Sequence, residues 1–193
     1  MNASGIAPTF AAAQAPPPWR ALAPTAGEPL VLADGRSVRV RPVRPGDAAA
    51  EQAFVTALSP GSRRRRFHGT MKQLPASVLR AMTAIDFRRH VALVAEAGCA
   101  DGAARLVADA RYVRDDDGDA EFAIAVADDW QGLGLGRALL RRLGRHARLS
   151  GVATLHGSVL ADNEPMLALL RSLGARLRDD HTDATLVQAT FAL

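Results

Sequence analysis

Gln131-Gly132-Leu133-Gly134-Leu135-Gly136-Arg137-Ala138 lies between an apolar stretch, 120–126, and an amphipathic stretch that continues to residue 150. The first stretch predicts a strand and the second a helix, so the glycines form the turn between them. Glycine lets successive backbone N–H groups turn inward and lets a ligand approach without interference from Cβ atoms. The helix that follows directs its positive dipole end to the same point. The turn is therefore predicted to bind an anion.

Two phosphate-binding patterns do not fit the spacing of this turn. A dinucleotide fingerprint, Gly-x-Gly-x-x-Gly, requires glycine at 137 or 139, where the chain has Arg137 and Leu139. A P-loop ends in Gly-Lys-Ser/Thr, whereas this turn ends in Gly136-Arg137-Ala138. A third phosphate-binding pattern, Gln-x-x-Gly-x-Gly, does fit the turn, where it is formed by Gln131, Gly134 and Gly136. The plain alternative is a glycine turn that only reverses the chain.

The rest of the chain predicts alternating groups of strands and helices. Strands are expected over 30–32, 37–43, 90–96, 105–113, 121–126, 153–160, 175–178 and 185–192. Helices are expected over 47–58, 59–68, 75–85, 136–150 and 166–173, with Asp47 capping the first. This order predicts a mixed α/β (α+β) fold with a central mixed, mostly antiparallel sheet and helices on both faces. Residues 1–30, with six prolines and nine alanines, are expected to form a flexible leader, and residues 31–193 one domain.

Several stretches carry a resemblance to a known family. Residues 120–136, with Asp128-Asp129-Trp130 before the glycine turn, and residues 160–166, with Leu173-Gly174, resemble the acyltransferase domain of bacterial GNAT protein lysine acetyltransferases. Leu58-Ser59-Pro60, Arg66-Phe67 and residues 89–95 are similar to the same group, and the likeness covers about residues 37–193. It implies a GNAT acyltransferase domain that transfers an acetyl group from acetyl-CoA to an amine by direct attack in a ternary complex.

The resemblance also implies which residues bind acetyl-CoA. Its pyrophosphate is expected on the backbone N–H groups of the turn, and the implied cofactor-binding residues are Val126, Gln131, Gly132, Leu133, Gly134, Leu135, Gly136, Arg137, Ala138 and Asn163. Asn163 matches the family asparagine at the pantetheine arm, although a helix cap explains it equally well. Arg137 lies nearest to the turn in a helical stripe of arginines and is the best candidate to meet a phosphate; the more distant Arg145 and Arg148 are better explained as solvated.

Acyl transfer to an amine requires a base, because an alkylammonium is almost wholly protonated at neutral pH. Glu121 is the candidate, since it begins the strand before the turn and shares a face with the small residues Ala123 and Ala125. The resemblance places the catalytic glutamate at this position; a surface ion pair is the alternative. It also implies that the backbone N–H of Val126, on a strand that diverges from its neighbour, polarises the thioester carbonyl.

The sequence departs from the family in its proton donor. Many GNAT enzymes carry a tyrosine in the late helix that protonates the leaving thiolate, and Leu170 occupies that position here. Tyr112 is the single tyrosine and does not match. Because the pKa of a thiol is near 8.5, we expect the thiolate to leave with the help of water alone.

Composition excludes several other classes of protein. The single cysteine, Cys99, cannot form an internal disulfide, and neither cysteine nor histidine occurs at metal-ligand spacing, so we expect no metal. No apolar run is long enough to span a membrane, and a cytoplasmic location is expected. The net charge of +4 comes from arginine, since Lys72 is the single lysine, and acidic residues are interspersed. Nucleic acid is therefore an unlikely partner, and the cluster Arg63 to Arg66 is expected to be a solvated face.

The acceptor is less visible in the sequence. A protein lysine is favoured over a small-molecule amine, and Asp179, Asp180 and Asp183 either attract a cationic acceptor or form a hydrophilic turn. The rival to an enzyme is a non-catalytic CoA-binding sensor module that kept the fold and lost turnover.

Overall fold

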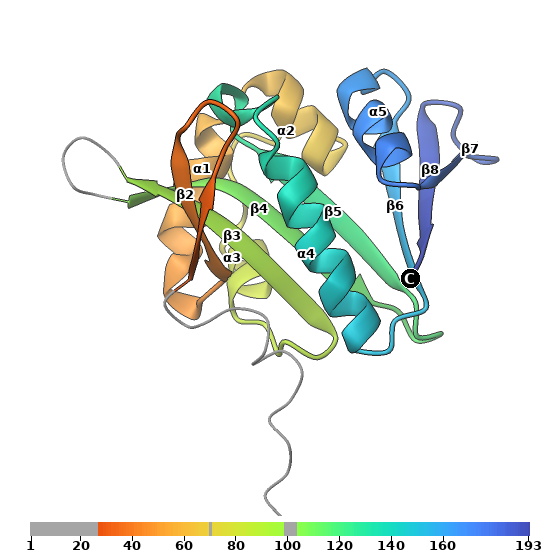
Figure 1. Ribbon diagram of the computed structural model, residues 1–193, viewed down its shortest axis with the longest axis horizontal. Coiled ribbons are helices and arrows are strands. Elements are labelled where there is room, and N and C mark those ends of the chain that lie inside the picture. The colour runs from red at the N-terminus through yellow and green to blue at the C-terminus, as the bar shows by residue number, and fades with distance from the viewer. Residues whose placement is uncertain (1–26, 70, 99–103) are drawn as a thin grey trace, which may run out of the picture.

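The computed structural model describes residues 27–69, 71–98 and 104–193, and Figure 1 shows their arrangement. The strands of the described chain are β1 (Glu28–Val31), β2 (Ser37–Pro42), β3 (His90–Gly98), β4 (Ala104–Arg114), β5 (Ala120–Val126), β6 (Thr154–Leu160), β7 (Arg176–Asp179) and β8 (Leu186–Ala192). The α-helices are α1 (Ala48–Ala57), α2 (Pro60–Phe67), α3 (Ala76–Thr83), α4 (Leu135–Leu149) and α5 (Glu164–Ser172). Short 3-10 turns, η2 (Pro45–Asp47) and η3 (Asp128–Trp130), precede α1 and the glycine turn.

All the strands join one sheet in the order β1-β2-β3-β4-β5-β6-β8-β7. Every neighbouring pair is antiparallel except β5 and β6, which are parallel and paired only at Ala120 with Leu155 and Glu121 with His156. Beyond Glu121 the two strands separate, and Figure 1 shows them diverging toward the end of β5 that leads into the glycine turn. The predicted mixed, mostly antiparallel sheet is confirmed, and the divergence of β5 from β6 is its main irregularity.

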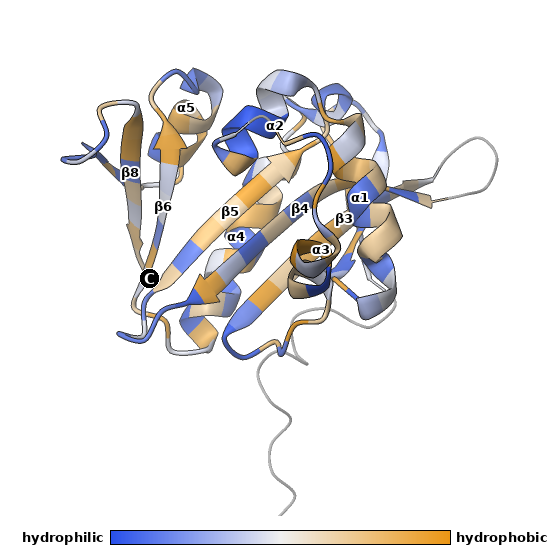
Figure 2. Cartoon of the chain, turned by 180° about the vertical axis from the view of Figure 1, so that it is seen from behind, coloured by the Kyte–Doolittle hydropathy of each residue, from blue (hydrophilic) through white to orange (hydrophobic). Residues whose placement is uncertain are grey.

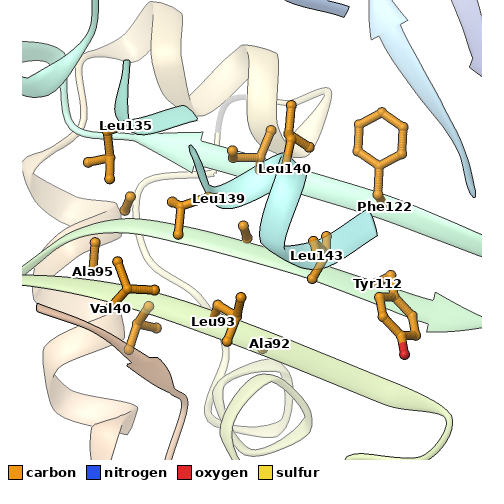
Figure 3. Packing of buried hydrophobic residues seen from close by; sticks show 14 of the residues in the cluster. Val40, Ala92, Leu93, Ala95, Tyr112, Phe122, Leu135, Leu139, Leu140 and Leu143 are labelled. Carbon is orange, nitrogen blue, oxygen red and sulfur yellow. The ribbon is translucent and has the colours of Figure 1, made fainter. Parts of the chain in front are cut away.

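Helix α4 covers one face of the sheet, and α1 and α3 cover the other. In α4, Leu135, Leu139 and Leu143 recur every four residues, are fully buried, and point toward the strands in Figure 3. Each buried leucine contributes about 1.5–3 kcal/mol to the free energy of folding. Ala147 extends this apolar stripe, which fixes the start of α4 at the end of the glycine turn.

The opposite face of the sheet contains charge. On β4, Asp109 and Arg111 are both buried and pair in register with Ala125 and Ala123 of β5. Figure 2, which views this face, shows hydrophilic bands across the central strands. Glu121 follows the same alternation and therefore lies on this face, whereas Tyr112 points toward α4.

Element boundaries differ slightly from those predicted. β1 begins at Glu28, and α5 includes Glu164 and Pro165, with Asn163 at its N-cap. Asp47 occupies the N-cap of α1, but its side chain makes no cap hydrogen bond. Its carboxylate instead accepts hydrogen bonds from the buried Arg41 guanidinium at 2.7 and 2.9 Å. The prediction of a side-chain cap was therefore wrong, because a charged partner outcompetes the helix amides.

Some sequence features fall outside the described residues, namely Cys99 and most of the 1–30 segment with its Trp19. Among the helices that are described, none has the length and apolar character needed to cross a membrane. No group of metal-ligating side chains occurs in the described ranges either.

We predict that His146 makes the fold sensitive to acid. Its Nδ1 lies 2.7 Å from the Tyr112 hydroxyl, and burial lowers the pKa of His146 to about 4 from 6.5. The unfolded chain therefore binds a proton that the folded chain refuses between these two pH values, so stability present above pH 6.5 is lost as the pH falls toward 4. This one group should remove about 2 kcal/mol between pH 7 and pH 5.

Urea unfolding of the parent protein and of His146→Asn at both pH values measures this contribution. Asparagine can still accept a hydrogen bond from the tyrosine but does not titrate. The variant should be less stable at pH 7 and should lose less stability on acidification; an equal loss in both proteins would contradict the assignment.

Candidate active site

A cleft of about 610 Å³ opens where β5 and β6 diverge. It is bounded by the glycine turn and the start of α4, by β5, by the end of α2, and by β6 with the start of α5. Its lining includes Ser62, Arg65, Arg66, His68, Glu121, Ala123, Ala125, Val126, Trp130, Gln131, Gly132, Gly134, Gly136, Arg137, Ser158, Asn163, Met166 and Leu169. Most of the residues expected at the site therefore meet in one cavity. The side chain of Leu135 is instead part of the core.

The three glycines of the turn have different roles. Gly132 and Gly134 have φ angles of +74° and +88°, in the left-handed region that side chains with a Cβ rarely adopt. Gly136 has ordinary helical φ, but a Cβ there would lie 3.4 Å from Leu169 Cδ2 and 3.8 Å from Val126 Cγ2. Two glycines therefore shape the turn, whereas a Cβ at Gly136 would make only ordinary van der Waals contacts with α5 and β5.

The turn presents unpaired backbone N–H groups. The amides of residues 132–137 donate no hydrogen bond to any described residue. Gln131 N–H contacts Asp128 O at 3.4 Å, and Ala138 N–H donates to Gly134 O at 3.0 Å as the first helical bond of α4. The available N–H donors are therefore those of residues 132–137, which lie inside the range from Gln131 to Ala138 that was expected to bind the pyrophosphate. With the helix dipole behind them, these amides form a cradle that fits a diphosphate.

Gln131 and Asp128 attach the turn to α2. The side-chain amide of Gln131 donates from Nε2 to Val126 O at 3.0 Å and to Ser62 Oγ at 3.2 Å. Asp128 accepts from both Ser59 and Ser62 hydroxyls at 2.7 Å, and these hydrogen bonds hold the pKa of Asp128 below its usual value against the effect of burial. Ser62 was not identified from the sequence, because it lies in the first turn of α2, after the N-cap Ser59, and local sequence does not show its contact with a distant segment. The glutamine in the Gln-x-x-Gly-x-Gly pattern thus fixes the position of the turn as well as lining the cleft.

Val126 directs its backbone into the opening between the strands. Ala127 N–H donates to Val107 O at 2.8 Å, so the Val126–Ala108 pair belongs to the non-hydrogen-bonded set of the antiparallel ladder. The N–H and C=O of Val126 therefore point away from β4, toward the side that β6 has left. The Gln131 side chain donates a hydrogen bond to the Val126 carbonyl, and the Val126 N–H faces the gap between the diverging strands.

Glu121 lies at the other end of the same strand. It is exposed and lines the cleft together with Ala123 and Ala125, as its predicted face requires. Its parallel register partner on β6 is His156, which in turn lies 3.5 Å from Asp115. The cleft thus contains backbone donors at one end of β5 and a carboxylate at the other.

Asn163 and Arg137, which were predicted to contact acetyl-CoA, also make hydrogen bonds within the protein. The Asn163 side-chain oxygen Oδ1 accepts from Met166 N–H at 3.4 Å, which is the expected helix cap, while the residue also lines the cleft. The Arg137 guanidinium donates to Ser172 Oγ at 2.8 Å and links α4 to α5 beside the turn.

The arginine cluster on α2 is not a uniform solvated face. Arg63 donates to Thr56 O and Leu58 O at the end of α1, and Arg64 pairs with Asp162 at 2.8 Å. Arg65 is exposed at the cleft, whereas Arg66 is largely buried beside Asp109. The expectation of a solvated face therefore fails for Arg66, because the sequence does not show the carboxylate that lies beneath it.

The acidic turn between β7 and β8 is internally hydrogen-bonded. Asp180 accepts from Thr182 and Gln188, and Asp183 accepts from Thr185. These bonds lower the pKa values of both aspartates, which remain ionised but are engaged by their own loop.

The late helix presents no tyrosine to the cleft. Leu170 is fully buried, and Met166 and Leu169 face the cleft instead. Tyr112 lies beneath α4, hydrogen-bonded to His146.

Comparison with known proteins gives consistent results. The family model for the acetyltransferase (GNAT) family matches residues 63–175. Acetyltransferase PA5475 of Pseudomonas aeruginosa is 37% identical over 163 residues, which are 84% of this chain and 87% of that protein. Acetyltransferase Pat of Mycolicibacterium smegmatis is 32% identical over 76% of this chain, which spans 44% of that longer protein. The solved GNAT domain of S. lividans PAT superposes with a TM-score of 0.78 at 29% identity, covering 86% of this chain and 97% of that domain.

We predict that Gly134→Ala weakens acetyl-CoA binding by about tenfold or more. The φ of +88° carries a penalty of about 1–2 kcal/mol for a residue with a Cβ, and relaxation of the turn would misdirect its amides. Gly118→Ala is the matched control. Gly118 has a φ of +92° and lies in the β4–β5 turn, and at both glycines the position of an added Cβ has no neighbouring atom within 4 Å.

Calorimetric titration with acetyl-CoA should give a raised Kd for Gly134→Ala and the parent Kd for Gly118→Ala, with similar losses of thermal stability. Equal affinities in all three proteins would contradict the assignment of the turn as the diphosphate cradle.

Proposed function

This chain belongs to the acetyltransferase (GNAT) family, and we propose that within this family it acetylates a lysine side chain of a protein. It is an acetyl-CoA-dependent N-acetyltransferase. The observation that supports the proposed chemistry is the joint presence, in one cleft, of the unpaired amides of the glycine turn and the carboxylate of Glu121.

The residues present fit acetyl-CoA. The amides of residues 132–137 fit its diphosphate, Arg137 lies beside them, and Asn163 lines the cleft farther along. When bound, acetyl-CoA supplies the acetyl group as a thioester. The divergence of β5 from β6 leaves room for an extended arm between the strands, where it can reach toward Glu121.

Glu121 is proposed as the general base. A lysine amine has an ordinary pKa near 10.4 and must lose a proton before it can attack a carbonyl carbon. On the same face of β5, the positions after Glu121 are Ala123 and Ala125, so an aliphatic amine can approach along this strand without meeting a large side chain of the strand itself. Glu121 would receive the proton directly or through a water molecule.

Val126 is proposed as the electrostatic partner of the base. Its backbone N–H points into the gap where the strands separate, and a fixed donor of this kind stabilises negative charge that develops on a carbonyl oxygen. Such a donor typically lowers the barrier by about 3 kcal/mol. With no tyrosine among the described cleft residues, we propose that water protonates the leaving thiolate.

Charge at the cleft favours a lysine in a protein over a free polyamine. Arg65, Arg66 and Arg137 line the cavity, against Glu121 as its carboxylate. Asp180 and Asp183, which the sequence offered as attractors of a cation, are held by their own loop. A polycation would therefore meet repulsion, whereas a single amine on an acidic surface would not.

We predict that Glu121→Gln lowers the rate of acetylation by about 100-fold or more while leaving the Kd for acetyl-CoA within twofold, since general bases typically contribute about 10²–10⁴-fold. Free thiol release is the readout, with lysine peptides of acidic and basic flanking sequence and with spermidine as acceptors. Glu28→Gln, a change at a partly exposed glutamate on the edge strand β1, is the control.

Peptides with acidic flanks should react fastest and spermidine slowest. Unchanged turnover in Glu121→Gln would remove the proposed base. A parent protein that binds acetyl-CoA and acetylates none of these acceptors would favour the sensor alternative.

A further inference from the structure

The glycine turn contributes few of the hydrogen bonds that hold it in place. The amides of residues 132–137 donate to no described residue, and these are the groups assigned to the diphosphate. A turn that keeps its N–H donors for a ligand has to be positioned through its carbonyl groups and through the residues that flank it. The turn between β1 and β2 supplies contacts of both kinds, because it lies against η3 and the glycine turn (Figure 1).

Arg36, the residue before β2, contacts the segment that leads into the glycine turn. Its Nη2 donates to the backbone carbonyl of Asp129 in η3 at 2.9 Å, and its guanidinium carbon lies 4.2 Å from the centroid of the Trp130 ring. The second distance is typical of a cation–π contact. Trp130 is 6% exposed and lines the cleft, and the next residue is Gln131, where the glycine pattern begins. Arg36 is not among the described residues that line the cleft, so it holds this segment from outside.

Asp34 fixes the direction of the Arg36 side chain. Its carboxylate accepts from Arg36 Nε at 2.6 Å and from the Arg36 backbone N–H at 3.1 Å. With Nε bound to Asp34 and Nη2 bound to Asp129, the planar guanidinium is held over the indole in one orientation. The neighbouring Ala33 N–H contacts the carbonyl of Leu133, inside the glycine turn, at 3.4 Å. The hairpin therefore contacts both the flank and the middle of the glycine turn.

The other contacts of η3 differ from those of Arg36. Asp128 is bound through its carboxylate by serines of α2, and the Asp129 carboxylate pairs with Arg105 of β4 at 2.7 Å. The pair with Arg105 is exposed on both sides, and exposed ion pairs stabilise a structure little. Arg36 instead binds the backbone of η3 and covers the ring of Trp130.

We propose that Arg36 is a positioning residue for the binding of acetyl-CoA: its guanidinium, oriented by Asp34, fixes Asp129 and Trp130 and thereby the direction of the amides of the glycine turn. The proposal rests on the assignment of that turn as the diphosphate cradle, and it requires neither a particular acceptor nor a particular base. Arg36 lies outside residues 63–175, the part of the chain that the family model matches.

The calorimetric Kd of the full chain for acetyl-CoA tests this role. Arg36→Met keeps a long side chain beside Trp130 but loses the hydrogen bond to Asp129, and it should raise the Kd about fivefold or more, because a less restrained turn has to be ordered on binding. Arg36→Lys keeps the charge without the planar fork and should give a smaller rise. Arg89→Met is the matched control, since it removes an exposed ion pair with Asp116 away from the cleft, and it should leave the Kd within twofold.

A double-mutant cycle with Gly134→Ala distinguishes positioning of the turn from a general structural role. If Arg36 acts through the turn, Arg36→Met should raise the Kd less than twofold further once Gly134→Ala has already misdirected the amides. A further fivefold rise in that background would show that Arg36 acts elsewhere and would overturn the proposal. An unchanged Kd in Arg36→Met alone would also overturn it.

Thermal unfolding establishes that each variant is folded. If Arg36→Met does not fold, Asp34→Asn replaces it, because asparagine keeps an oxygen for the backbone N–H of Arg36 but loses the second acceptor that holds Nε. This variant should raise the Kd about twofold to threefold. The parent Kd in Asp34→Asn would then count against the proposal in the same way.

Turnover separates the positioning role from the proposed function. With a peptide acceptor, Arg36→Met should raise the KM for acetyl-CoA about fivefold and leave kcat at saturating acetyl-CoA within about twofold. A parent protein that acetylates no lysine peptide would refute the proposed function and leave the comparison of Kd values intact. Parent values of Kd and KM in Arg36→Met, with normal turnover, would refute the positioning role and leave the proposed function standing.

Discussion

The separation of β5 from β6 is the constraint on which the rest of the structure depends. Two parallel residue pairs join the strands at the start of β5, and none follows. Beyond that point, the backbone groups on the open edge of β5 have no hydrogen-bond partner on a neighbouring strand. Unless a ligand or another part of the chain contacts them, these groups are exposed to water. The fold places the glycine turn, α2 and α5 around this opening, and Gln131 satisfies the Val126 carbonyl from within the chain.

The parts of this arrangement that depend on neighbouring residues could be predicted from the sequence. Period-two and period-four patterns located the strands and α4, and alternation alone placed Glu121 on one face with Ala123 and Ala125. The spacing of Gly132 and Gly134 identified a glycine turn between a strand and a helix, and the structure adds that both residues have left-handed φ angles. These are local properties, because propensity, periodicity and backbone conformation are determined by residues close in the chain.

Contacts between distant segments could not be predicted in the same way. Asp128 meets Ser59 and Ser62, and Arg66 meets Asp109, only because α2 packs on the end of β5. A run of consecutive arginines in a helix normally indicates a solvated surface, and the burial of Arg66 becomes reasonable only when the opposing carboxylate is known. Asp47 illustrates the same limit on a shorter scale, since the side chain of Arg41 displaced the helix cap that the sequence favoured.

The two faces of the sheet differ in their packing, because one is apolar and the other contains buried charges. The α4 face is packed with leucine, and the buried contact between Tyr112 and His146 in that layer needs no net charge. The α1 and α3 face accepts buried charges, which on their own stabilise a fold little and can destabilise it. Such a cluster is tolerable when the opposite face already supplies a large apolar core. Because β5 contributes alternate residues to both faces, it packs against the leucines of α4 on one face and presents Glu121 on the charged face. A carboxylate on a packed strand needs less reorganisation before it accepts a proton than one on a loop, which supports the proposal that Glu121 is the base.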